Sequence, residues 1–531
     1  MSQLVAAPMA VALAGAVLTL LTRRFERLQR SLSTLAMLGY AVAVGALAVR
    51  VFPRTALVYQ VGDWPAPFGI TLIADPLSTF MLVLGTAVAV PALLYSLRSI
   101  DSYGQRLSYH SLFHFLLLGI TGSFLTGDIF NLFVWFEVML MASYVLVVFE
   151  GGPQETRATF YYLVLNLLGS AIMLLAIGGL YAATGTLNMA DIARRLAHAQ
   201  AWGIDPAPVL GVSGLLFAVF ALKAGIVPFH FWVPAAYRAA PSPVSAMLAG
   251  VTKKVGIYAI VRLYFTVFAP VPVTLGFGIK DSTLAFLAPV LLVMAAASIA
   301  LGGIAAVSRE DLDGVLAYSS ISQVGFIILP LAVGAAVPTV RSLAIAAALI
   351  YALNHALAKG MLFLVSGAVS ETTGATEFEV LGGLAGRAPV LSGAFLIGAF
   401  SLIGIPPLSG FFGKLLVFDA AVQAESTIAL ALALTGAILT IAYYTRSWNR
   451  AFWSVSPEGQ AAGRPDRALV AIVATLAVGI VLVGIGFEPV FRAAMDAAAV
   501  ATDPESYVQA VLGPDAWTAG PDGTGTRGGG H

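Results

Sequence analysis

Long apolar runs, separated by short loops that carry charges or Pro and Gly, recur along almost the whole chain. Most runs reach about 20 residues, the length at which an α-helix crosses the hydrocarbon layer of a membrane. They predict about 14 transmembrane helices, at 2–22, 31–52, 71–97, 109–127, 129–149, 159–183, 209–235, 241–268, 283–307, 314–334, 341–369, 388–419, 424–453 and 468–488. We therefore expect an all-α polytopic membrane protein.

Composition agrees with this interpretation and excludes several classes of function. Charged residues make up 10% of the chain, against about 25% in an ordinary soluble domain, and the mean hydropathy is +0.90. The net charge of +1 argues against a nucleic-acid-binding protein. The absence of Cys excludes disulfides, thiolate metal sites and a cysteine nucleophile. No Walker A sequence is present either, so we expect neither ATP nor a cofactor.

The distribution of basic residues predicts the orientation. No charge precedes the first apolar run, and RRFERLQR follows it directly, which is the reverse of the flanks of a signal peptide. With the N-terminus outside, fourteen basic residues fall on the inner side and eight on the outer side. This excess follows the positive-inside rule. The Gly-rich polar stretch 502–531 is expected to be a disordered tail.

Five of the six lysines lie inside predicted spans, where each cation costs about 2.5 to 3.5 kcal/mol on insertion scales. The matching acid is Glu137, alone in IFNLFVWFEVMLMASYVLVVF, and we expect it to pair with Lys223 directly or through water. The alternative is a set of charges that only fixes helix packing or reaches the membrane surface. Lys253 fits that alternative best, because the next residue, Lys254, repeats the charge and the two side chains point about 100° apart on a helix. The five lysines are Lys223, Lys253, Lys254, Lys359 and Lys414.

Helix-breaking residues lie beside two of these lysines. Gly225 and Pro228 follow Lys223, and Pro406 and Pro407 precede Lys414. The seventh and twelfth helices should therefore be broken near mid-membrane, as in transporters built from inverted repeats. The alternative is two unrelated proline kinks.

The spacing of the breaks predicts the domain organisation. The broken helices are five apart, so helices four to eight should mirror helices nine to thirteen, and an odd number of helices per unit requires inverted topology. The predicted units are an N-terminal three-helix segment (1–108), a first five-helix repeat (109–268), a second inverted repeat (283–453) and a C-terminal helix (468–488).

Three histidine positions need separate interpretations. His355 and Lys359 are four residues apart and share a helix face, and an imidazole can pass protons near neutral pH. We expect a relay role for His355, with a structural core histidine as the alternative. His110 and His114 have the same spacing but no accompanying acid as in a zinc HExxH motif, so they should be interfacial.

Several segments of the chain resemble a known family. They are GDIFNLFVWFEVMLMASY, LKAGIVPFHFWVPAAY, PSPVSAMLAGVTKKVGIYAIVR, AYSSISQVGFI, NHALAKGMLFLVSG and GIPPLSGFFGK, and they lie between residues 127 and 414. The chain is similar to the proton-translocating antiporter-like subunits shared by respiratory complex I, membrane-bound hydrogenases and Mrp-type Na+/H+ antiporters. Within that family it looks most like the D subunits of the Mrp type. The sequence departs from the complex I pattern at Ala235, where an acidic residue is lost, and Tyr351 replaces a His found in some relatives.

The resemblance implies a function and a set of residues. It implies a non-enzymatic secondary transporter subunit in a bacterial cytoplasmic membrane, with other antiporter subunits as partners and with protons, and Na+ for the assembled complex, as cargo. Release of the Glu137 partner from Lys223 would send a proton along the path to Lys414. The alternative is a proton-pumping membrane subunit of a complex I-like NADH dehydrogenase or hydrogenase. A receptor for an anionic ligand is disfavoured, because the lysines are spread over both halves. The implied proton path consists of Glu137, Lys223, Lys254, His355, Lys359 and Lys414.

Overall fold

The computed structural model describes residues 3–52, 56–269, 272–275, 279–455, 463–518 and 520. In this part of the chain, twelve helices are long and apolar enough to cross a membrane, and two shorter apolar helices, Tyr109–Leu125 and Pro389–Ile403, accompany them. Each predicted span coincides with one of these helices. The prediction of an all-α polytopic membrane protein is confirmed.

The N-terminal third contains the first six apolar helices and a small hairpin. Strands β1 and β2 pair antiparallel, with Leu57 opposite Ala74. The elements are α1 (Gln3–Leu21), α2 (Glu26–Val51), β1 (Leu57–Gln60), the 3-10 turn η1 (Val61–Asp63), β2 (Thr71–Ala74), α3 (Pro76–Ser99), α4 (Ser102–Arg106), α5 (Tyr109–Leu125), α6 (Ile129–Val147), α7 (Pro153–Thr184) and α8 (Met189–Ala197).

The middle of the chain contains the first broken helix and a rod assembled from α- and π-helical turns. The broken helix consists of α9 (Pro206–Ala224) and α10 (Trp232–Ala239). The rod runs from Ser242 to Val267 as α11 (Ser242–Met247), η2 (Leu248–Thr252), α12 (Lys253–Ile260) and η3 (Val261–Val267). A second hairpin follows, with β3 (Pro272–Leu275) and β4 (Ile279–Ser282).

The remaining elements include the second broken helix, α17 and α18. They are α13 (Thr283–Val307), α14 (Leu312–Ala336), η4 (Pro338–Val340), α15 (Arg341–Thr373), α16 (Leu384–Arg387), α17 (Pro389–Ile403), α18 (Ser409–Gln423), α19 (Thr427–Ser447), η5 (Trp448–Trp453), α20 (Arg467–Ile485), α21 (Phe487–Ala501) and α22 (Pro504–Leu512).

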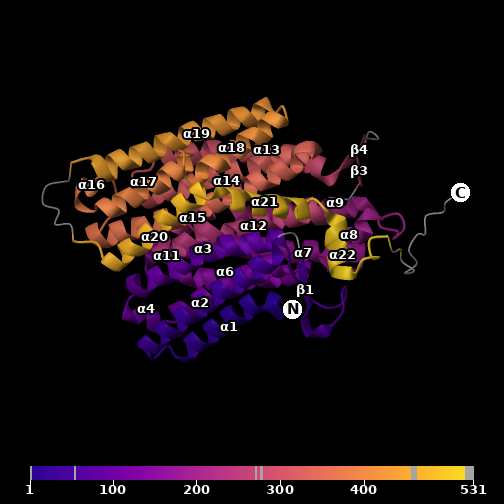
Figure 1. Cartoon of the computed structure of the whole chain (residues 1–531), viewed down its shortest axis with the longest axis horizontal. Coiled ribbons are helices and arrows are strands. Elements are labelled where there is room, and N and C mark those ends of the chain that lie inside the picture. The colour runs from indigo at the N-terminus through magenta and orange to yellow at the C-terminus, as the bar shows by residue number, and fades with distance from the viewer. Residues whose placement is uncertain are drawn as a thin grey trace.

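The long helices run side by side, with α1 and α2 along one edge of the molecule and α19 along the opposite edge (Figure 1). The most deeply buried helices lie between those edges (Figure 1). The most apolar 18-residue stretch of the rod is fully buried, and so is that of the span Pro338–Thr373. In α20, only 28% of the corresponding stretch is buried. Lys253, Lys254, His355 and Lys359 thus lie on helices that protein covers on all sides.

Two segments differ from the sequence-based prediction. Residues 71–74 were expected to open a helix but form β2, because α3 begins only after Asp75, which caps it through Ser78, with Pro76 at the first helical position. The tail from 502 was expected to be disordered, but Pro504–Leu512 form α22. Its apolar face, with Tyr507 and Val508, is buried and packs on α8, which explains the order. Residues 519 and 521–531 lie outside the described residues.

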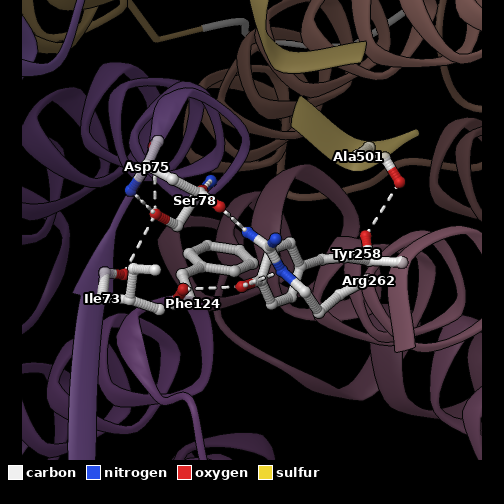
Figure 2. Close-up of polar contacts among 8 residues, drawn as sticks. Ile73, Asp75, Ser78, Phe124, Tyr258, Arg262 and Ala501 are labelled. Carbon is white, nitrogen blue, oxygen red and sulfur yellow. Dashed lines mark hydrogen bonds and ion pairs between the residues drawn. The ribbon is translucent and has the colours of Figure 1, made fainter. Parts of the chain in front are cut away.

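A buried ion pair joins the rod to the start of α3 (Figure 2). The Arg262 guanidinium donates to both carboxylate oxygens of Asp75, at 2.7 and 2.6 Å, and both side chains are 1% exposed. The Arg262 guanidinium also lies over the rings of Tyr258 and Tyr507. One turn further along the rod, Thr266 donates to the carbonyl of Ala501 at 2.9 Å. The pair therefore fixes the N-terminal helices, the rod and the C-terminal helices to one another.

Removal of one partner of this pair should destabilise the protein strongly. Asp75→Ala leaves the Arg262 charge buried without a counter-ion, a change that typically costs about 3 to 5 kcal/mol. We expect a marked fall in the midpoint of thermal unfolding of the purified protein in detergent.

Glu26→Ala is the matched control, because its ion pair with Arg106 is 2.9 Å long but lies at the surface, where such pairs contribute about 0 to 1 kcal/mol. Equal midpoints for the two variants would contradict the structural role of the Asp75–Arg262 pair.

Candidate functional site

Glu137 and Lys223 are connected through a serine hydroxyl. Ser170 on α7 donates a short hydrogen bond to the Glu137 carboxylate on α6 and accepts one from Lys223 Nζ on α9 at 3.0 Å. Lys223 also donates to the carbonyl of Asn166 at 3.5 Å, and its ammonium lies 5.6 Å from the centre of the Phe136 ring. The acid and the lysine were expected to meet directly or through water, and here a serine hydroxyl joins them. The acid, the hydroxyl and the ammonium form one hydrogen-bonded unit.

The interruption after α9 places Lys223 in the last turn of a helix. α9 ends at Ala224, Gly225 adopts the left-handed conformation with φ 66°, and α10 begins at Trp232. A Cβ on Gly225 would lie 2.5 Å from the Val233 side chain, so a larger residue does not fit there. The carbonyl end of a helix carries partial negative charge, which favours a cation in its last turn.

The second interruption supplies a backbone oxygen to Lys414. α17 ends at Ile403, Gly404 has φ 94°, and α18 begins at Ser409, with Pro406 and Pro407 in the non-helical stretch between them. Lys414 Nζ donates to the carbonyl of Ile403 at 3.0 Å. Among the described residues, no carboxylate lies within 4.0 Å of this ammonium.

The central lysines are grouped around α14 and α15. Lys254 Nζ lies 2.6 Å from Nδ1 of His355 and donates to the carbonyl of Ala249 at 2.6 Å. One turn after His355 on α15, Lys359 donates to the carbonyl of Leu316 at 3.0 Å and to the Ser319 hydroxyl. His355 and Lys359, which were expected to share a face of α15, therefore have a lysine and a serine as their respective side-chain partners.

Lys253 points away from Lys254, as the helix geometry predicts, but it also has a polar partner. It donates to the carbonyl of Ser320 at 2.8 Å and to the hydroxyl at 2.6 Å. Ser320 follows Ser319, the partner of Lys359, on α14. Two lysines from different helices are thus held by adjacent serines.

A second set of polar side chains fills the region between His355 and the break beside Lys414. Asn354 accepts from Ser401 at 2.6 Å and from Ser409 at 2.8 Å, and these serines flank the break. Tyr351 donates a short hydrogen bond to Gln323, whose amide donates to the hydroxyl of Tyr443 at 2.7 Å. These hydroxyl and amide groups place polar side chains between the central lysines on α15 and the start of α18.

Sequence reasoning missed the neutral polar side chains of the site. Signals for some of them were present: Ser170 lies in an otherwise apolar helix, and Ser319, Ser320 and Gln323 stand together in AYSSISQ. The hydrogen-bonding side chains that were not predicted are Ser170, Ser319, Ser320, Gln323, Asn354, Ser401 and Ser409.

His110 and His114 lie elsewhere, and their surroundings differ from the expectation. Both are 0% exposed and face Ser33 on α2, at 3.4 and 3.1 Å from its hydroxyl. They were expected at a membrane interface, but α1 and α2 pack over α5 and enclose them. In the described part of the chain, no group of three potential metal-binding side chains includes them.

The chain has extensive similarity to known proteins. The profile described as NADH:quinone oxidoreductase/Mrp antiporter, transmembrane region, matches residues 126–440. That stretch contains the whole line of buried side chains from Glu137 to Lys414. The chain belongs to this family.

The chain is similar to two kinds of family member, which carry different names. It is 36% identical to the D subunit of the Na+/H+ antiporter of Alkalihalophilus pseudofirmus, over 96% of this chain and 100% of the relative. It is also 36% identical to the N subunit of the NADH-quinone oxidoreductase of Desulforudis audaxviator, over 90% and 93% of the two chains. A chain in the Mrp complex from Dietzia sp. has the same fold, with a TM-score of 0.86 and 28% identity over 96% of this chain and 99% of that one.

Proposed function

We propose that the chain is the proton-translocating subunit of a multisubunit Mrp-type Na+/H+ antiporter. It would lie in the bacterial cytoplasmic membrane with its N-terminus outside, act as a non-enzymatic transporter subunit and work with other antiporter subunits. Similarity to the D subunit of a Na+/H+ antiporter over the whole length of that relative supports this function. The observation that carries the proposal is the set of buried lysines, of which, among the described residues, only Lys223 is connected to an acid.

Hydrogen bonds support two parts of the proposed path, from Glu137 to Lys223 and from Lys254 to His355. The path begins at Glu137, Ser170 and Lys223, continues through Lys254, His355 and Lys359, and ends at Lys414. The 2.6 Å contact of Lys254 with His355 supports a direct proton transfer, because an imidazole nitrogen can accept a proton that an ammonium gives up. Neutral hydroxyls and carbonyls hold the other ammonium groups. These oxygens stabilise a lysine while it is charged and can still accept a hydrogen bond from the neutral amine when it is not.

Glu137 acts as the switch in this proposal. While the Ser170 hydroxyl joins the two charges, the carboxylate stabilises the Lys223 ammonium. If the hydroxyl turns away, the cation loses that stabilisation in an apolar surrounding and its proton is free to move on. The switch therefore needs a charge at Glu137 rather than only its volume.

A second candidate function is a proton-pumping subunit of a complex I-like enzyme or a hydrogenase. The 36% identity to the N subunit of an NADH-quinone oxidoreductase favours it. Mild purification of the native complex separates the two: copurifying subunits with flavin, iron–sulfur clusters or nickel would support the second function, and antiporter subunits without redox centres would support the first.

The proposed path predicts different effects on exchange for substitutions of two adjacent lysines. Lys254→Ala removes the proton partner of His355 and should abolish Na+/H+ exchange by the assembled complex in membrane vesicles. Lys253→Ala removes contacts with Ser320, which has no group that titrates in the working range, so exchange should be largely retained. Complex assembly is checked for both by native gel electrophoresis. Full exchange in the Lys254 variant together with loss in the Lys253 variant would overturn the assignment.

The switch is tested by two substitutions of one residue. Glu137→Gln keeps the size of the side chain and an acceptor for Ser170 but removes the charge, so exchange should be lost. Glu137→Asp keeps the charge at shorter reach, so partial exchange should remain. If the side chain served packing only, Gln would be the milder change, because Asp leaves a gap. Exchange is measured over a pH series, and better performance by Gln at every pH would reject the switch.

A further inference from the structure

Two polar cavities meet at an acid that the proposed path does not use. The larger cavity has a volume of about 480 Å³ and the smaller about 300 Å³, and Glu155, Arg238 and Asp313 line both. Each cavity has room for several water molecules, whose share of liquid volume is about 30 Å³ each. Water in either cavity can therefore reach Asp313.

Asp313 differs from the other charged groups around it. Asp311, two residues earlier, caps α14 through the Gly314 amide at 2.6 Å and pairs with Arg238 at 3.3 Å. Asp313 makes no ion pair within 4.0 Å in the described structure, and it accepts a hydrogen bond from the Ser366 hydroxyl on α15 at 2.5 Å. The other charged or titratable side chains that line the cavities are Glu150, Glu155, His230, Arg309, Tyr318, Glu371 and Glu377.

The smaller cavity offers a second acid that holds protons readily. Glu150 lies in the loop after α6, and burial, followed by repulsion from Glu155 and Asp101, raises its pKa. The carboxylates around the cavities thus repel one another. Such repulsion favours the binding of protons from water at this surface.

The helices connect Asp313 to Lys359. Leu316, whose carbonyl accepts from Lys359, is one turn after Asp313 on α14, and the Ser319 partner of Lys359 is one turn further. On α15, Ser366 follows Lys359 by two turns, about 10 Å at the usual rise of an α-helix. Asp313 and Ser366 therefore lie at the cavity end of the same pair of helices that holds Lys359.

We propose that Asp313 exchanges protons between the water of these cavities and Lys359. This proposal rests on the proposed function. The Asp313 carboxylate takes a proton from a hydronium ion in the cavity and leaves a water molecule behind. It then gives that proton, through the Ser366 hydroxyl and a chain of water molecules along α15, to the neutral amine of Lys359, and the carboxylate is restored. Nothing is oxidised or reduced, and the reverse sequence releases a proton to the cavity.

Exchange in vesicles that contain the complete complex tests this role. Asp313→Asn should lower the exchange rate by about tenfold or more, the range expected for the loss of a proton-transferring group, with the greatest loss at alkaline pH, where free protons are scarce. Asp313→Glu should restore most of the rate. Glu505→Gln, which changes an exposed acid on α22 that lines neither cavity, is the matched control and should behave like the wild type.

The outcomes separate this proposal from the proposed function. Loss in the Asn variant that is equal at every pH, with no recovery in the Glu variant, would indicate a structural role and overturn the assignment of Asp313. Normal exchange in Asp313→Asn together with loss in Lys254→Ala would also overturn it, while leaving the lysine path intact. Normal exchange in both variants would overturn the path as well as the inference.

Discussion

The structure depends on how lysine ammonium groups are accommodated in buried positions of apolar helices. A charge in such surroundings is costly unless hydrogen bonds replace its hydration. Here the replacements are mostly neutral oxygens: the hydroxyl of Ser170, the carbonyl of Ile403, and the serine pair on α14. Because these partners carry no charge, they accommodate a lysine without fixing its protonation state.

Arg262 is accommodated in the opposite way. Its guanidinium is equally buried but lies against the carboxylate of Asp75 (Figure 2). It also lies over the rings of Tyr258 and Tyr507. An arginine stays protonated in proteins, so this pair is suited to a permanent structural joint. Lysines with neutral partners are suited to the release of a proton. The chain thus uses the two kinds of cation for different purposes within the same rod, with Arg262 two turns after Lys254.

The helix breaks also help to accommodate the buried lysines. A continuous helix would use every carbonyl internally, whereas the end of α17 leaves the Ile403 oxygen free for Lys414. At the other break, Lys223 occupies the carbonyl end of α9. Glycine in a left-handed conformation ends the helix at each place. The inverted repeat that relates the two breaks remains a prediction.

The sequence was sufficient to predict the spans and the buried charges, because long apolar runs and the ionisable residues within them are local properties. Ser170 and Ser319 were not predicted, because a serine in an apolar helix is ordinary and its partner depends on how neighbouring helices rotate against each other. Helix α22 was missed for a similar reason: its few apolar residues, such as Tyr507, gain order only from packing on α8. Asp313 stood near a predicted helix start, where an acid usually has a capping or dipole role.

The most direct test of the central claim is Na+/H+ exchange by the assembled complex with Lys223→Arg. Arginine keeps a positive charge within reach of Ser170 and Glu137, but it does not give up its proton at physiological pH. If Lys223 must release its proton during transport, the arginine variant should assemble normally and be as inactive as Lys223→Ala. Exchange close to the wild-type rate with arginine would show that a fixed charge is enough, and would contradict the account of buried lysines as proton carriers.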